Sequence, residues 1–176
     1  KPLINAGKVE IVFRGDVLGW DPKNAMELME RCLKETQEQV DGVLIMNDDI
    51  GSGVEVILAA HGLQGKVRIF GGYDAILDGV VRVMTGLQEI DMAPSYKEMA
   101  DAAAQLMVSL ITQEEPPSGL INAAFDNNYV KGGVPAAYIP SILIKKNNVE
   151  ETIIKRGIYT KEQLEAGIKS YKNSKN

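Results

Sequence analysis

The sequence predicts an α/β fold built on a parallel sheet, and three observations carry that prediction. Apolar runs typical of strands alternate with stretches whose apolar residues recur every three or four positions, as on one face of a helix. Glycine or turn residues stand at the ends of several of these stretches. Polar residues and one tryptophan gather just after the strand-like runs. Strands and helices in strict alternation imply parallel strands joined by right-handed crossovers.

The alternation is clearest in the first two thirds of the chain. Residues 8–13 alternate and are rich in Val and Ile, which predicts a strand. Asp21 and Pro22 read as an N-cap and first helical residue, followed by about four amphipathic turns. Residues 40–46 form a nearly continuous apolar run, typical of a strand covered on both faces. Further strands are expected at 66–70 and 87–92, and further helices at 51–60, 75–84 and 94–111.

The remaining third is less regular. A turn-rich break at 114–119 precedes the apolar stretch 120–125 and a loop at Gly132 and Gly133. The expected elements after it are a last strand at 138–144, a short helical turn at 149–155 and a helix at 161–170, with a frayed polar end at 171–176. The whole pattern indicates a doubly wound sheet of the Rossmann-like or flavodoxin-like type.

Composition excludes several classes of function. The net charge of −5 argues against nucleic acid as a partner, because phosphate contacts need a basic surface. The single cysteine, Cys32, excludes an internal disulfide and reads as buried filler. The single histidine, His61, reads as a capping or surface residue, and no second histidine exists for a His-pair metal site. No apolar run reaches the roughly 20 residues of a membrane span. No cofactor or metal is expected.

Polar and aromatic residues follow four of the predicted strands. Trp20 comes after the first strand, Asn47 after the second, Asp74 after the third, and Asp91 ends the fourth. Ligands of an open parallel sheet bind beyond the carboxyl ends of its strands, so these side chains are expected at one edge. An aromatic face, an amide and a carboxylate suit a small sugar, whose hydroxyls both donate and accept hydrogen bonds.

Each of these residues also has a purely structural interpretation. Asn47 and Asp74 could cap the helices that follow them, and Trp20 could be a core or staple residue before Asp21. Asp48 and Asp49 could mark a metal or phosphoacceptor site, but the further acidic pair that such a site needs is missing. No catalytic constellation is present, so the protein is not expected to be an enzyme.

Several short motifs occur in a specific order. The run from Gly19 to Ala25 contains Trp20, Pro22 and Asn24, the second strand ends in Asn47 and Asp48, and Gly72 to Asp74 follows the third. The tail then carries Lys-Asn-Asn-Val at 146–149. In this order the motifs resemble the periplasmic sugar-binding proteins of ABC importers (the type I periplasmic binding protein fold), and within them the xylose-binding branch.

The resemblance implies two Rossmann-like lobes joined by three crossovers, with a sugar in the cleft between them. Trp20 would stack on the sugar ring, and Asn47 and Asp74 would hydrogen-bond its hydroxyls. The xylose-binding branch carries a lysine before a proline at the second crossover, whereas this chain reads Asp-Met-Ala-Pro at 91–94. Asp91 would take the place of that lysine, which puts xylose itself in doubt.

The resemblance also implies that the chain is the C-terminal part of such a protein. Residues 1–92 and 138–176 would form the sugar-binding lobe, and 93–137 would return to an N-terminal lobe that is mostly absent. The helix at 94–111 would then need another partner for its apolar face. The expected outcomes are a complementing N-terminal fragment, a swapped homodimer or a self-contained flavodoxin-like domain.

The function that the resemblance implies is monosaccharide binding, most simply of a xylose-like pentose, without catalysis. The protein would be extracytoplasmic, either periplasmic or lipid-anchored at the outer face of a Gram-positive membrane. It would deliver sugar to an ABC importer permease or report it to a membrane sensor protein. The alternative is the sugar-sensing core of a LacI-type transcriptional repressor, which shares the fold and would be cytoplasmic.

Overall fold

The computed structural model describes residues 2–173. The chain divides into two compact units, each described here by itself. Unit 1 contains the residues up to Ala93 and those from Leu143 on, and unit 2 runs from Pro94 to Ile142. None of the helices within residues 2–173 combines the length and apolar character that a membrane span requires.

The N-terminal segment of unit 1 is mostly irregular. It begins with the short helix α1 (Pro2–Asn5) and reaches the 3₁₀ turn η1 (Leu18–Trp20) without forming the strand predicted at 8–13. That prediction is wrong because a strand needs a hydrogen-bonded neighbour, and no strand of the described residues pairs with this segment. Ile11 is therefore 63% exposed, while Phe13 packs against the core and lies 5.1 Å from the Arg31 guanidinium.

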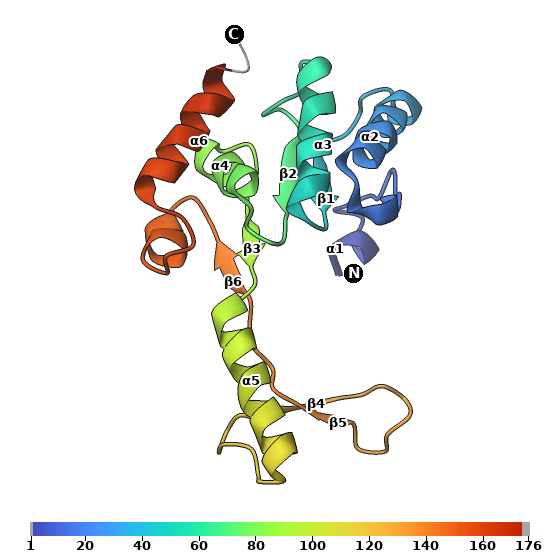
Figure 1. Cartoon of the computed structure of the whole chain (residues 1–176). Helices are drawn as coiled ribbons and strands as arrows, with labels where there is room; N and C mark the ends of the chain where they lie inside the picture. The colour runs from blue at the N-terminus through green and yellow to red at the C-terminus, as the bar shows by residue number, and fades with distance from the viewer. Residues whose placement is uncertain (1, 174–176) are drawn as a thin grey trace. The chain divides into compact units, whose positions relative to one another are not determined.

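Helices α2 (Pro22–Thr36) and α3 (Asp48–Ala60) pack side by side (Figure 1). Asp21 caps α2 by accepting from the Lys23 amide at 2.7 Å, with Pro22 as the first helical residue, as the sequence predicted. Gly53 lets the two helices approach closely, because a Cβ there would clash with the Pro22 carbonyl oxygen. The core between them and the sheet contains Met29, Cys32, Leu33, Val54 and Leu58, so Cys32 is buried as expected.

Strands β1 (Gly42–Ile45) and β2 (Arg68–Gly71) run parallel, with Val43 opposite Ile69. The expectation that the first of these is covered on both faces is wrong. Ile45 is 3% exposed, but Leu44 is 74% exposed and Met46 65%. One face of this strand therefore packs on the core and the other faces solvent.

The rest of unit 1 extends the alternation. Helix α4 (Leu77–Thr85) ends at Gly86, which is left-handed with φ 83°. Strand β3 (Asp91–Ala93) pairs with β6 (Ile142–Ile144), and a parallel bridge between Ile69 and Gln88 links β2 to the segment before β3. The π-helical turn η2 (Glu150–Ile154) and helix α6 (Lys161–Asn173) follow.

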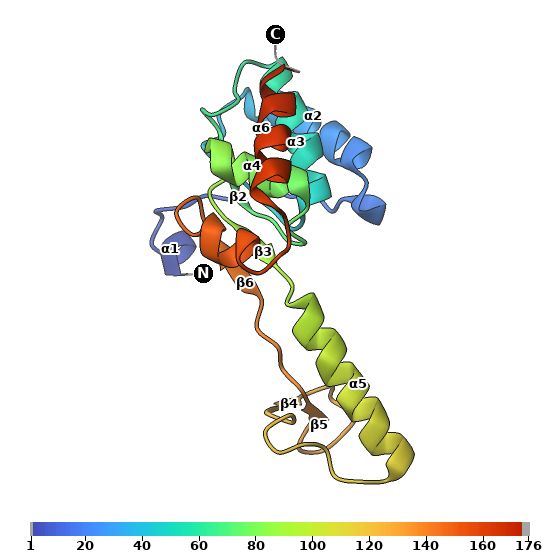
Figure 2. The same cartoon turned by 60° about the vertical axis from the view of Figure 1, so that its left-hand side comes forward.

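Helix α6 packs along α4, as both views show (Figure 2). Tyr171 near its end is hydrogen-bonded to Glu55 of α3 and accepts from Gln64 at 2.6 Å. Burial and the Glu55 carboxylate raise the pKa of Tyr171, so the hydroxyl stays protonated. The prediction of a frayed end is therefore wrong for 171–173, and residues 174–176 lie outside the described part of the chain.

Unit 2 consists of helix α5 (Tyr96–Thr112) and an antiparallel hairpin of β4 (Ala123–Phe125) and β5 (Val134–Ala136). The helix lies close to its predicted position, but β5 was not expected. Ala102 and Ser109 are the residues of α5 that are buried. Several of its apolar side chains are more than half exposed: Met107, Val108, Leu110 and Ile111.

Candidate functional site

Trp20 is presented at the surface by the turn that leads into α2. It is 57% exposed and has a left-handed backbone with φ 59°. The side-chain amide of Asn24 donates to the Leu18 carbonyl at 2.8 Å, which fixes this turn to the first turns of the helix. The core interpretation of Trp20 is therefore wrong, and a flat apolar face is available at this point.

Asn47 caps α3. Its side-chain oxygen accepts from the Ile50 amide at 3.0 Å, and the residue is only 7% exposed. The capping interpretation of Asn47 is thus correct. One lone pair of that oxygen and the side-chain NH₂ group remain for other contacts, so capping leaves part of the amide available.

Asp74 lies in the loop between β2 and α4, which we call the 71–76 loop. It does not cap α4, because that helix begins at Leu77 and its N-cap position, Ile76, provides no side-chain cap. The residue is half-buried with φ 95°, and its amide donates to the Met92 carbonyl at 3.0 Å. Within residues 2–173 no hydrogen bond or ion pair is recorded for its carboxylate, which leaves this group available to a ligand.

Asp91 lies in the interior instead of at the edge of the sheet. It is 0% exposed, and its Oδ1 accepts from the Met92 amide at 2.6 Å. Burial, followed by the negative charge of Asp48, raises the pKa of Asp91 to about 8. In this conformation the Asp91 carboxyl does not reach the solvent.

Backbone hydrogen bonds bring Asn47 and Asp74 into one neighbourhood. The amide of Asp48, next to Asn47, donates to the Tyr73 carbonyl at 3.1 Å, and Tyr73 directly precedes Asp74. The start of α3 and the 71–76 loop therefore adjoin one another, as the rule for carboxyl ends of parallel strands predicts. No hydrogen bond between described residues joins Trp20 to this pair.

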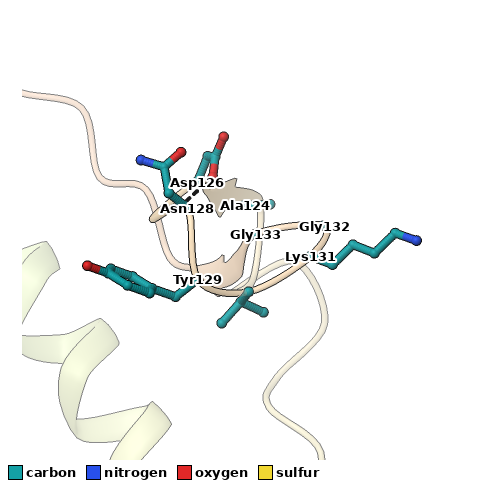
Figure 3. Close-up of a pocket in the computed structure, with 8 residues that line it drawn as sticks. Ala124, Asp126, Asn128, Tyr129, Lys131, Gly132 and Gly133 are labelled. Carbon is teal, nitrogen blue, oxygen red and sulfur yellow. Dashed lines mark hydrogen bonds between the residues drawn. The ribbon is translucent and has the colours of Figure 1, made fainter.

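Two hollows of the surface are lined by other residues than the four predicted ones. One of about 360 Å³ lies beside η1 and is lined by Asp16, Leu18, Asn24, Glu27, Leu28 and Arg31. Another of about 550 Å³ lies inside the hairpin loop of unit 2, where Asp126, Tyr129 and Lys131 surround it (Figure 3). Within residues 2–173 no group of three or more His, Cys, Asp or Glu side chains is placed to hold a metal ion.

Sequence reasoning missed a buried polar group under the 71–76 loop. Arg82 and Gln88 are each 1% exposed, although charged and amide side chains are seldom fully buried. The Arg82 Nε donates to the Gln88 Oε1 at 2.9 Å. Arg82 stands between Val81 and Val83 within an apolar helix stripe, and that position is the one signal that could have revealed it.

A comparison with protein-family models matches residues 2–115 to the periplasmic binding protein domain. The chain belongs to the periplasmic binding protein family. Two curated relatives carry the name D-xylose-binding periplasmic protein. The one from Escherichia coli (strain K12) is 34% identical over 93% of this chain and 48% of its own length. The one from Haemophilus influenzae is 35% identical over 93% and 47%. The chain thus spans about half the length of these relatives.

Solved structures of periplasmic binding proteins share the fold of the chain. A carbohydrate transporter solute binding protein from Chloroflexus aurantiacus, in complex with D-glucose, superposes with a TM-score of 0.70 at 22% identity, over 82% of this chain and 42% of its own. An ABC transporter solute binding protein from Clostridium phytofermentans with bound β-D-glucose gives 0.71 at 19%, over 93% and 52%. These likenesses confirm the predicted fold class, one lobe of a type I periplasmic binding protein.

Proposed function

We propose that this chain is the C-terminal, sugar-binding part of an extracytoplasmic solute-binding protein. Its ligand is a monosaccharide of the xylose-like pentose type, and it performs no catalysis. The observation that carries the proposal is the half-buried Asp74 carboxylate, which has no recorded partner among the described residues. The loop that carries it is hydrogen-bonded through Tyr73 to Asp48, the residue after the capping Asn47. The 34–35% identity to proteins named D-xylose-binding supports the choice of ligand.

The exposed Trp20 supplies the third element of the proposed site. Its ring would cover the apolar C–H face of a sugar, while Asn47 and Asp74 bond to the hydroxyls. A carboxylate that accepts from two hydroxyls makes charge-assisted bonds about twice as strong as neutral ones. Asp91 has no direct contact with sugar in this proposal, because its side chain is 0% exposed.

We further propose that unit 2 completes a second lobe with a partner. Its helix α5 leaves Leu110 79% and Ile111 73% exposed, and Phe125 of the hairpin is 67% exposed. The occupant of this apolar surface would be an N-terminal half like that of the curated relatives, of whose length this chain spans 48% and 47%. A swapped homodimer is the other outcome to test. Both outcomes would be refuted by sedimentation experiments in which the chain stays a stable monomer and does not associate with an added N-terminal half.

Binding of the sugar would close the two lobes and present a surface to an ABC importer permease or a membrane sensor. The protein would lie in the periplasm or be lipid-anchored outside a Gram-positive membrane. The repressor alternative receives no support from the relatives and structures described above, which are all solute-binding proteins. Growth on the sugar, with and without the chain's gene, would separate import from sensing.

The test uses the fluorescence of Trp20, the single tryptophan of the chain. The chain, alone and mixed with the N-terminal half of the Escherichia coli relative, is titrated with D-xylose, D-ribose and D-glucose. We expect a saturable change with D-xylose in the mixture, and its loss in Asp74→Ala. Asp49→Ala is the matched control, because Asp49 is an exposed carboxylate in the first turn of α3. No response to any of the sugars, confirmed by calorimetry, would overturn the proposal.

A further inference from the structure

A buried cluster of polar side chains lies against the 71–76 loop. It contains Asp48 from the start of α3, Arg82 from α4, Gln88 from the segment after α4, and Asp91 from β3. The two aspartates are 0% exposed and the other two residues 1%. Two buried carboxyls thus share one buried cation, which leaves an excess negative charge if both are ionised.

Arg82 is committed to several partners at once. Its Nη2 donates to the Asp48 backbone carbonyl at 2.9 Å and lies 3.7 Å from the Asp48 Oδ1. Its Nη1 donates to the Ser52 hydroxyl at 2.9 Å. The guanidinium therefore balances Asp48 but makes no recorded hydrogen bond to Asp91.

The two carboxyls converge beneath one residue of the loop. A Cβ at Gly72 would lie 2.7 Å from the Asp91 Oδ1 and 2.8 Å from the Asp48 Oδ1. As acceptors, the Asp48 Oδ1 and the Asp91 Oδ2 are left without a hydrogen-bond partner among residues 2–173. Burying an acceptor without a donor costs free energy of folding. If one of two neighbouring carboxyls is protonated, its O–H can donate to the other, and this hydrogen bond removes the cost.

We propose that Asp48 and Asp91 share one proton, and that the protonated pair positions the 71–76 loop. The proton sits on one carboxyl and is donated to the other, so the pair carries one negative charge opposite Arg82. The assignment of these residues as positioning residues for sugar binding rests on the proposed role of Asp74. The sharing of the proton stands independently of that role.

The loop is held by the cluster at several backbone positions. The Gln88 side chain donates to the Gly71 carbonyl at 2.8 Å, and the Asp48 Oδ2 accepts from the Ile76 amide at 3.0 Å. The Asp48 amide and the Met92 carbonyl, next to Asp91, bond to Tyr73 and Asp74 as described above.

These bonds hold a backbone that the loop would not adopt by itself. Asp74 and Ala75 have φ of 95° and 50°, a region that residues with a Cβ rarely occupy. Gly72, at φ 119°, also lacks the side chain that would collide with the two carboxyls. Expansion of the cluster by charge repulsion would therefore act first on this loop.

The expected titration follows from burial. Burial raises the pKa of both aspartates. The pKa of Asp91 is raised to about 8, and the negative charge of Asp48 is the second cause. For Asp48, the positive charge of Arg82 partly offsets the effect of burial. Tyr159 also faces the cluster, and its pKa is raised by burial and by the charges of Asp48, Asp78 and Asp91. A proton held more tightly in the folded state makes stability fall as pH rises from about 4 to about 8.

The test follows the loop by NMR in the 176-residue chain without sugar. In the wild type we expect the amide signals of Gly72, Tyr73 and Ile76 to shift together between pH 6 and 9. In Asp91→Asn, which keeps the shape and supplies a permanent donor, that transition is expected to vanish. The matched control is Asp78→Asn, an exposed carboxylate nearby, which should keep the transition.

The carboxyl ¹³C signals of the wild type test the same proposal without any variant. One aspartate signal titrating well above the ordinary carboxyl range supports the shared proton. Ordinary titration of every aspartate, or a loop transition that persists unchanged in Asp91→Asn, would overturn it. Sugar binding that stays intact without such a titration removes only this inference. A clear titration with no sugar binding in any variant removes only the proposed function.

Discussion

Helices α2 and α5 have similar lengths, 15 and 17 residues, yet their apolar side chains are buried to very different extents. In α2 of unit 1, Met29 and Leu33 are 4% and 1% exposed and contribute to a core shared with α3. In α5 of unit 2, Leu110 and Ile111 are 79% and 73% exposed. Amphipathic spacing thus predicts a helix and its apolar face, but not whether the chain itself supplies the surface that covers that face.

The largest expected effect compares one leucine from each unit. Leu58→Ala removes a side chain that is 1% exposed in unit 1 and should cost about 2–5 kcal/mol of unfolding free energy. Leu110→Ala, in the exposed face of α5, should change it by about 0.5 kcal/mol or less. Urea unfolding followed by circular dichroism measures both. A similar loss of unfolding free energy at both positions would mean that the apolar face of α5 is covered in solution. The two units would then not differ in this respect.

A medium effect concerns the cap that places Asn47 beside the 71–76 loop. Asn47→Ala removes the bond to the Ile50 amide and should cost about 1 kcal/mol of stability. Asn47→Ser keeps a capping oxygen and should retain most of the stability in the same unfolding experiment. If both variants lose sugar binding while only Asn47→Ala destabilises the protein, Asn47 caps the helix and contacts the ligand through separate interactions. Equal stability of Ala and wild type would contradict the cap.

The smallest effect concerns His61, which follows α3 and joins it to α2 and to the residues just after α2. Its ring is hydrogen-bonded to Glu38 at 2.8 Å and to Glu30 at 3.0 Å, and these bonds raise its pKa, that of Glu38 first. The stabilisation is present below about pH 6.5 and is lost as pH rises through the raised pKa of the folded state. NMR titration of this single histidine should show a lower pKa in Glu38→Gln. An unchanged pKa would show that the contact is absent in solution.

Local signals were sufficient where the structure depends on neighbours in the sequence. Spacing and chain order predict the cap at Asp21 and Pro22 and the termination of α4 at Gly86. They also predict that Asn47 lies near the loop that contains Asp74. The strand expected at 8–13 depends instead on a hydrogen-bonded neighbour, which no strand of the described residues provides. Leu44 and Met46 are apolar residues typical of a strand, but no local sequence signal showed that their face of β1 is exposed to solvent.

The candidate site was predictable only in part for a similar reason. Asp48 and Asp91 are 43 positions apart, and the sequence places one directly after a predicted strand and the other at the end of another. Their burial against Arg82 requires the arrangement of three elements, which no short motif encodes. Trp20 shows the opposite case, since a core interpretation was locally reasonable and the 57% exposed side chain contradicts it.

The hydrogen bond from Tyr171 to Glu55 spans 116 positions of the chain and has a consequence for the order of folding. Unit 1 is discontinuous, because all of unit 2 is inserted between β3 and the segment that contains β6, η2 and α6. Closing a loop of that length costs chain entropy before any contact of α6 offsets it. We therefore expect the first 93 residues to gain structure early and α6 to dock late, so that docking of the C-terminal helix is the last step in the folding of unit 1.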